Sequence, residues 1–179
     1  GIAHTRWATH GEVTVSNTHP HLSYDKRFVL VHNGVIENFN TLKRFLINKG
    51  IESVSETDSE VLCNLIAYHY SELPEGDDRF IDAVRLALPQ CRGAYGIAVL
   101  CVDYPDTMVG ARRGSPLVVG LGEDANFIAS DASAFVGRAK EAVFLNDGEL
   151  AILKGNEFRI TTMEGLEAKA VTHPVDQIA

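Results

Sequence analysis

The second half of the chain is divided into short apolar runs, and this pattern limits the folds open to it more than any other feature. The runs that predict strands lie at residues 94–103, 107–112, 116–121, 126–130, 142–145, 149–153, 157–161 and 166–171. Asn146-Asp147-Gly148 and Gly155-Asn156 are typical hairpin turns, because these residue types tolerate a positive φ. Connections this short favour antiparallel neighbours, so we expect antiparallel sheets.

Helical patterns dominate the first half. Apolar residues at helical spacing predict helices that end at Gly50, near Ser71 and at Pro89. The middle helix begins with a capping box at residues 57–60, where Thr57 is the N-cap. A brief helix is also expected at residues 133–139.

Further strands are expected at residues 1–7, 27–32 and 51–55. Asn-Gly usually marks a hairpin, but here Asn33-Gly34 lies between a buried strand and the approach to a helix. Helices laid over antiparallel sheets define a single α+β layered domain, which we expect to span residues 1–179.

Composition excludes several kinds of partner. The net charge of −8 argues against nucleic acid and anionic membrane surfaces, which bind basic faces. The longest apolar run, residues 97–102, is far too short to cross a bilayer. Cys63, Cys91 and Cys101 are widely spaced, which is typical of reduced thiols in a cytoplasmic protein.

Polar residues that could bind a ligand occur at the ends of the predicted elements. Arg6 can hold a carboxylate through paired hydrogen bonds, and Asp58 can accept from an ammonium group, so together they suit an α-amino acid. Asn33 and the backbone N–H of Gly34 could form an oxyanion hole. Each also has an ordinary structural interpretation: a solvated arginine, a carboxylate in the first turn of a helix, and a plain turn.

No metal ligand set or nucleophile emerges from the sequence. His19 and His21 would share a face of a strand, but Pro20 separates them and no carboxylate lies at ligand spacing. We therefore expect no metal and no cofactor. The glycine-rich residues 110–122 lack the phosphate-loop pattern. Cys63 falls in a predicted helix, Cys91 at a link from helix to strand and Cys101 in a predicted strand, with no base nearby in sequence, and we expect inert thiols.

A series of motifs in order resembles one family along essentially the whole chain. The motifs are HTRWATHG at 4–11, NTHPH at 17–21, HNGVIEN at 32–38, SETDSE at 55–60, RGAYG at 92–96, GSPL at 114–117 and ASD at 129–131. They resemble the glutaminase domain of the glutamine–fructose-6-phosphate aminotransferases (glucosamine-6-phosphate synthases), which are class II glutamine amidotransferases.

The resemblance implies a fold and a chemistry. It implies a four-layer αββα sandwich of antiparallel sheets, of the N-terminal-nucleophile hydrolase type. It also implies hydrolysis of glutamine to glutamate, with the ammonia passed to sugar isomerase domains in a parent that is a homodimer or larger.

The resemblance also implies roles for individual residues. Arg6 matches the residue that binds the α-carboxylate of glutamine, and Asp58 matches the residue that binds its α-amino group. Thr9 and His10 match positions that line the same pocket. Asn33 and Gly34 match the oxyanion hole, while Trp7 matches a residue that gates the ammonia path.

One departure from the family concerns the nucleophile. In the family it is a cysteine at the N-terminus of the mature protein, whereas this sequence begins with Gly1, and Cys63, Cys91 and Cys101 do not match it. We therefore expect an internal or trimmed segment without glutaminase activity of its own. It is either a fragment that is rearranged or self-associated, or a sample from which upstream residues were removed or left out of the numbering.

Two alternatives remain open at this point. One is the glutaminase domain of another class II amidotransferase, of the amidophosphoribosyltransferase or asparagine synthetase type. The other is a non-catalytic module that binds an amino acid.

Overall fold

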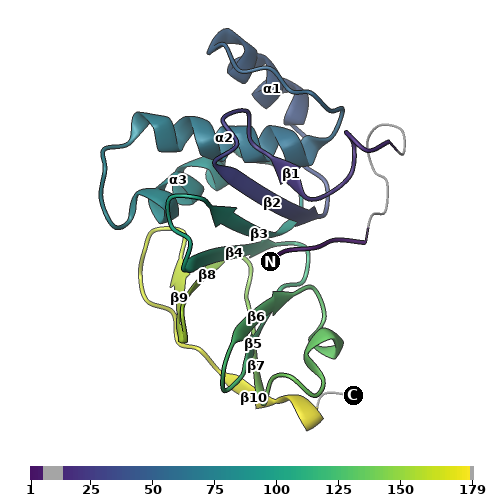
Figure 1. The fold of residues 1–179 in the computed structure, drawn as a ribbon, viewed down its shortest axis with the longest axis vertical. Helices are drawn as coiled ribbons and strands as arrows, with labels where there is room; N and C mark the ends of the chain where they lie inside the picture. The colour runs from purple at the N-terminus through teal and green to yellow at the C-terminus, as the bar shows by residue number, and fades with distance from the viewer. Residues whose placement is uncertain (6–13, 178–179) are drawn as a thin grey trace.

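Two antiparallel sheets form the centre of the computed structural model, which describes residues 1–5 and 14–177 (Figure 1). In spatial order the first sheet contains β1 (His21–Leu22), β2 (Phe28–Asn33), β3 (Tyr95–Cys101), β4 (Thr107–Arg113), β8 (Glu149–Lys154) and β9 (Glu157–Thr162). The second contains β10 (Thr172–Pro174), β7 (Glu141–Phe144), β5 (Val118–Leu121) and β6 (Asn126–Ala129). Neighbouring strands run antiparallel throughout, which confirms the predicted α+β class.

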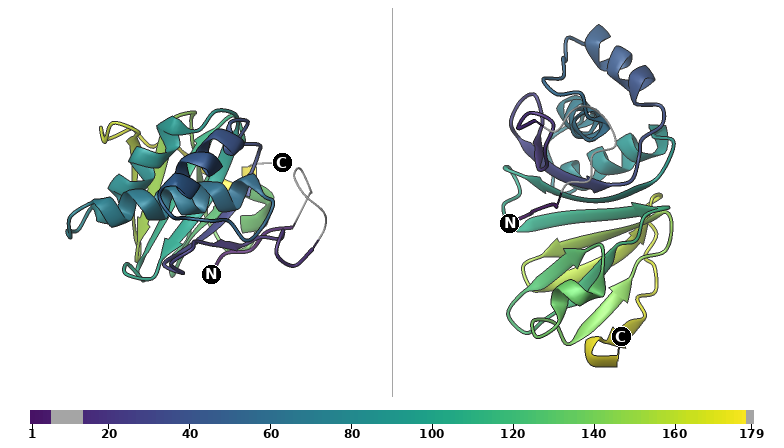
Figure 2. Two further views of the ribbon diagram at one scale, coloured as in Figure 1. Left: turned by 90° about the horizontal axis from the view of Figure 1, so that it is seen from above. Right: turned by 90° about the vertical axis from the view of Figure 1, so that its right-hand side faces the viewer.

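Helices and the second sheet cover opposite faces of the first sheet (Figure 2). The helices are α1 (Phe39–Asn48), α2 (Asp58–Glu72) and α3 (Arg79–Ala87), and the 3₁₀ helix η1 (Leu88–Gln90) follows α3. Phe135 of η2 (Ala132–Phe135) packs with residues of the second sheet, and η3 (Val175–Gln177) follows β10. Short 3₁₀ helices thus accompany the second sheet, while α-helices cover the first.

Strand β2 shows how alternation divides the side chains between two layers. Phe28, Leu30 and His32 are buried, whereas the residues between them are half-buried. Phe28 and Leu30 belong to the core formed with α1, α2 and α3. Because successive side chains of a strand point to opposite faces, Asn33 lies on the face toward the second sheet. The neighbours His32 and Asn33 therefore enter different layers.

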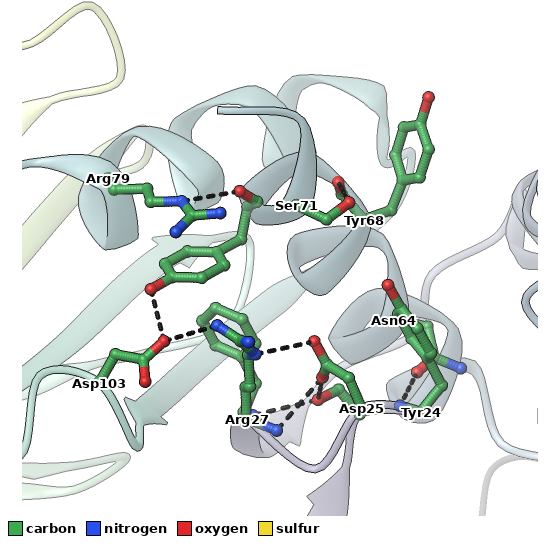
Figure 3. Close-up of polar contacts among 11 residues, drawn as sticks. Tyr24, Asp25, Arg27, Asn64, Tyr68, Ser71, Arg79 and Asp103 are labelled. Atoms are coloured by element: carbon green, nitrogen blue, oxygen red, sulfur yellow. Dashed lines mark hydrogen bonds and ion pairs between the residues drawn. The ribbon is translucent and has the colours of Figure 1, made fainter. Parts of the chain in front are cut away.

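A polar cluster at the other end of β2 joins the sheet to the helices (Figure 3). The Asp103 carboxylate accepts from Arg27 at 2.8 Å and from the Tyr70 hydroxyl at 2.6 Å. Arg79, the first residue of α3, donates to the Tyr70 carbonyl at 2.9 Å and lies 3.9 Å above its ring. The cluster connects the end of β3 with the last turns of α2 and the start of α3.

At residues 1–5 and 51–55 the structure lacks strands that the sequence predicts. Residues 1–5 have no strand assignment, and the rest of the strand expected at 1–7 lies outside the described residues. Residues 51–55 form no strand because the Glu60 carboxylate takes the backbone N–H groups of Val54 and Ser55, at 2.9 and 2.6 Å. A side chain from α2 thus satisfies backbone groups that a sheet partner would otherwise bind.

The C-terminal part also differs in detail from the expectation. Asn146-Asp147-Gly148 is not a hairpin turn: β7 pairs with β5 and β10, while β8 pairs with β4 and β9, so this turn carries the chain between the sheets. The last strand forms at Thr172–Pro174 and not at 166–171, and the helix expected at 133–139 is the 3₁₀ helix η2. Gly155-Asn156 does connect a hairpin, β8 to β9.

Within the described part of the chain, no helix combines the length and apolar character needed to cross a membrane.

Candidate functional site

The predicted corner at Asn33-Gly34 is present at the end of β2. Gly34 has φ +112°, and a Cβ at this position would lie 2.3 Å from the Ala94 carbonyl oxygen. Only glycine fits both the backbone conformation and this close approach. Beyond the corner, Val35 accepts from the Ala94 N–H at 3.0 Å, and Ile36 bridges to Gly93. The chain therefore turns from the strand toward α1, as the sequence predicts.

A cavity of about 360 Å³ lies between the two sheets beside this corner. Asn33 lines it, together with His4, Gly96 and Ser130. The Oδ1 of Asn33 lies 2.5 Å from the His4 Nε2, a hydrogen bond in which the ring N–H donates. The other end of the Asn33 amide carries N–H donors, which are the groups an oxyanion hole requires.

Asp58 lies on the other side of the corner. It is the first residue of α2 and is 2% exposed. Its Oδ2 accepts from the Ile36 backbone N–H at 2.7 Å and lies 4.0 Å from the His32 Nδ1. Asp58 does not line the cavity that Asn33 faces. The structure therefore brings Asn33, Gly34 and Asp58 to one corner, with the corner backbone between the amide and the carboxylate.

The remaining predicted site residues, Arg6, Trp7, Thr9 and His10, lie outside the described residues. The convergence of Arg6 and Asp58 on one ligand therefore stays a prediction.

Histidines and hydroxyl groups surround the start of α2. His21 Nε2 lies 3.0 Å from the Thr57 Oγ1, and His19 Nε2 lies 3.0 Å from the Ser59 Oγ. The rings of His4 and His19 stack at 4.1 Å. Among the described residues, no group of three or more His, Cys, Asp or Glu side chains could hold a metal ion. His19, His21 and His32 thus each contact a hydroxyl group at the start of α2.

The contact between His32 and Ser59 was not predicted from the sequence. His32 Nδ1 lies 2.9 Å from the Ser59 Oγ, and its Nε2 lies 3.2 Å from the Ala94 carbonyl oxygen. A signal was available, because alternation along β2 places this polar residue on the apolar face with Phe28 and Leu30. A polar side chain on a core face needs partners, so its position already implied a buried contact.

The start of α2 satisfies half of the predicted capping box. Thr57 is the N-cap, and its hydroxyl accepts from the Glu60 N–H at 3.3 Å. The Glu60 side chain does not return to the N–H of Thr57, as a capping box requires, but binds Val54 and Ser55. Glu60 therefore anchors the segment before the helix.

The three cysteines are buried and free. Burial raises the pKa of Cys63 well above its usual value, the pKa of Cys91 to about 12 and that of Cys101 to about 11. A raised pKa keeps each thiol protonated at neutral pH, and the thiolate is the nucleophilic form. None of the three can therefore act as an activated nucleophile.

The packed antiparallel sheets, with α-helices over one of them, are shared with solved amidotransferases of the N-terminal-nucleophile type, and this likeness gives the class of the fold. The B. subtilis glutamine phosphoribosylpyrophosphate amidotransferase in complex with ADP and GMP superposes with a TM-score of 0.70 at 26% identity, over 89% of this chain and 34% of that one. A family model described as a glutamine amidotransferase domain matches residues 4–137, and the chain belongs to this family.

Curated relatives are more similar in sequence. The glutamine–fructose-6-phosphate aminotransferase of Caldanaerobacter subterraneus subsp. tengcongensis is 48% identical over 86% of this chain and 24% of the relative. Its counterpart from Bacteroides thetaiotaomicron is 46% identical over 93% of this chain and 27% of the relative. The chain thus spans about a quarter of the length of these relatives.

Proposed function

We propose that this chain is the glutamine-hydrolysing, ammonia-supplying domain of a glutamine–fructose-6-phosphate aminotransferase. The observation that supports it most directly is the buried corner where Asn33, Gly34 and Asp58 meet. The sequence identity of 42–48% to aminotransferases of this name supports the same conclusion.

The oxyanion hole follows from the chemistry of amide hydrolysis. When a nucleophile adds to the γ-carbonyl of glutamine, negative charge develops on its oxygen. The Asn33 side-chain amide and the Gly34 backbone N–H are the donors that stabilise this charge. These donors stabilise the charge well only if they are held in place before the reaction. The close approach of Gly34 to the Ala94 carbonyl oxygen fixes the backbone at this point.

The amino acid end of glutamine is held by charges of both signs. Asp58 binds the α-ammonium group, while Arg6 binds the α-carboxylate as a bidentate partner. Thr9 and His10 line the same pocket, and Trp7 gates the path by which ammonia leaves. Removing the partner of either charge leaves that charge of the ligand uncompensated, which weakens binding strongly.

The longer protein supplies the remaining chemistry. Its sugar isomerase domains receive the ammonia and form glucosamine 6-phosphate, in a cytoplasmic homodimer or larger assembly. The amidophosphoribosyltransferase alternative has support from the superposition at 26% identity, but the 48% identity to the fructose-6-phosphate enzyme favours the latter.

Replacement of Asp58 tests the amino acid site. Asp58→Asn removes the charge but keeps an oxygen for the Ile36 N–H, so the corner survives. We expect the affinity for glutamine and glutamate, measured by calorimetry, to fall about tenfold or more. Glu52→Gln, at an exposed position, is the control and leaves the affinity unchanged. Equal affinities of Asp58→Asn and the parent chain would contradict the proposed role.

Assay of the chain by itself tests the assignment of the nucleophile. Because the thiols of Cys63, Cys91 and Cys101 are buried and protonated, we expect no steady release of glutamate from glutamine. The same chain joined to an N-terminal segment that begins with cysteine, taken from one of the relatives, should release ammonia. Release by the unextended chain would show that a different nucleophile acts.

A further inference from the structure

We propose that His32 is a positioning residue that holds the two halves of the glutamine site in a fixed position relative to each other. The inference rests on the proposed function and goes beyond it, because His32 lies outside the groups assigned to contact glutamine. One half of the site is the Asn33-Gly34 corner, and the other is Asp58 at the start of α2. His32 is 3% exposed and lies between them, in the layer of the helices.

The first anchor of His32 is the backbone that shapes the corner. Its Nε2 lies 3.2 Å from the Ala94 carbonyl oxygen, so this nitrogen carries a proton and donates. The same oxygen would lie 2.3 Å from a Cβ on Gly34. The position of the Ala94 carbonyl therefore sets how closely Gly34 can approach, and with it the direction of the Gly34 N–H.

The second anchor is the first turn of α2. His32 Nδ1 lies 2.9 Å from the Ser59 Oγ, within hydrogen-bond distance. Ser59 follows Asp58 in the helix, and the Asp58 carboxylate lies 4.0 Å from the same Nδ1. That carboxylate in turn accepts from Ile36, just beyond the corner. His32 thus completes a closed loop of contacts from the corner to the helix and back.

A general structural role predicts something different. If His32 only fills a polar position in the core, its replacement lowers the stability of the whole domain and affects every ligand alike. If it positions two separate halves, each anchor can be lost alone, and each loss affects a different part of the bound ligand. Asparagine and glutamine separate the two anchors, since their amides overlay the Nδ1 and Nε2 positions respectively.

Two ligands report on the two halves. Glutamine contacts both the corner and Asp58, whereas norvaline has the same carbon chain without the carboxamide and therefore lacks the group that the corner binds. In His32→Asn, which keeps the contact to Ser59 and loses Ala94, we expect the affinity for glutamine to fall about three- to tenfold and that for norvaline to stay within about twofold. In His32→Gln, which keeps Ala94 and loses Ser59, both affinities should fall by a similar factor.

The measurement is an NMR titration of the full chain, which follows the Gly34 amide as well as the affinities. The amide signal of free Gly34 should shift in His32→Asn but stay near its original position in His32→Gln. Ser59→Ala removes the second anchor with a smaller change, so it should behave like His32→Gln even if a His32 variant folds poorly.

The outcomes separate this inference from the function on which it rests. Equal losses for both ligands in both His32 variants, or an unmoved Gly34 amide in His32→Asn, would overturn the positioning role. A parent chain that binds neither glutamine nor norvaline overturns the proposed function, while the Gly34 amide in the free protein still reports whether His32 sets the corner.

Discussion

Gly34 and Gly93 lie on the two backbone segments that meet at the corner and allow these segments to approach more closely than side chains would permit. A Cβ on Gly34 would meet the Ala94 carbonyl oxygen at 2.3 Å, and one on Gly93 would meet the Val35 carbonyl oxygen at 2.1 Å. Both glycines have a positive φ, which other residues adopt only with strain. The geometry of the corner therefore depends on two residues that have no side chain, Gly34 and Gly93.

Substitution of Gly34 tests this dependence. Gly34→Ala combines an unfavourable φ with a clash against backbone, and we expect it to lower the free energy of unfolding by about 2–4 kcal/mol. Urea denaturation measures the change. Gly76→Ala is the matched control, because Gly76 has no atom within 4 Å of a Cβ, and we expect it to stay within about 0.5 kcal/mol of the parent. A Gly34→Ala variant as stable as the control would show that the corner can relax.

Helix α2 is the element on which the site and the core both depend. Its first ten residues, 58–67, are all buried, because α1, α3, β1 and β2 pack around it. Four of these residues are polar, and three of them, Asp58, Ser59 and Glu60, stand at its first turn. Each of the three contacts a segment outside the helix. Asp58 contacts the corner, Ser59 contacts β2 and residue 19, and Glu60 contacts the loop before α2. The start of α2 is therefore a polar junction inside an apolar core.

Removal of the Glu60 carboxylate should loosen this junction. Glu60→Ala leaves the buried N–H of Ser55 and the N–H of Val54 without their acceptor, and we expect a loss of about 2–4 kcal/mol in the free energy of unfolding. Thermal and urea unfolding measure it. Glu52→Ala, at an exposed position of the same segment, should change the stability by less than about 0.5 kcal/mol. Similar losses in both variants would contradict an anchoring role for Glu60.

At the scale of the whole molecule, separate apolar clusters stack through the layers. The largest lies between the helices and the first sheet, a second lies between the two sheets, and a third lies between the second sheet and η2. Tyr70 and Tyr95 both belong to the largest cluster, and their hydroxyls titrate only at high pH. The free energy of unfolding at alkaline pH therefore reports on the packing of this cluster.

Stability should fall steeply at alkaline pH. Burial raises the pKa of Tyr95 to about 12, and burial followed by the hydrogen bond to Asp103 raises the pKa of Tyr70 well above its usual value of 10.0. The neutral phenols are favoured in the folded state, so their contribution is complete below pH 10 and is lost as the pH rises from about 10 to about 12. Urea midpoints at intervals from pH 8 to about pH 11.5 measure the loss.

Tyrosine variants serve as the control for this pH dependence. Tyr95→Phe and Tyr70→Phe each remove one titrating phenol, so each should flatten the decline above about pH 10. A decline as steep in both variants as in the parent chain would assign the alkaline loss to other groups.

Much of the local structure could be predicted because local signals are strong. The helices end near Gly50 and Pro89 as expected, Thr57 is the N-cap, and Asn33-Gly34 forms a corner and not a hairpin. The failures share one cause. Residues 51–55 have the composition of a strand, but a carboxylate from α2 takes their N–H groups. Asn146-Asp147-Gly148 has the composition of a hairpin, but the strands that flank it join different sheets.

Local signals in the sequence were enough to predict the kinds of elements, the corner at Asn33-Gly34 and the alternation that sends His32 and Asn33 to opposite faces of β2. The order of the strands, the partners of the buried polar groups and the contacts of His32 with Ala94 and Ser59 became visible only in the folded molecule. The reason is physical: propensity and periodicity act between residues close in sequence, whereas the choice of sheet partners and of buried hydrogen bonds depends on which distant segments pack together with the lowest free energy.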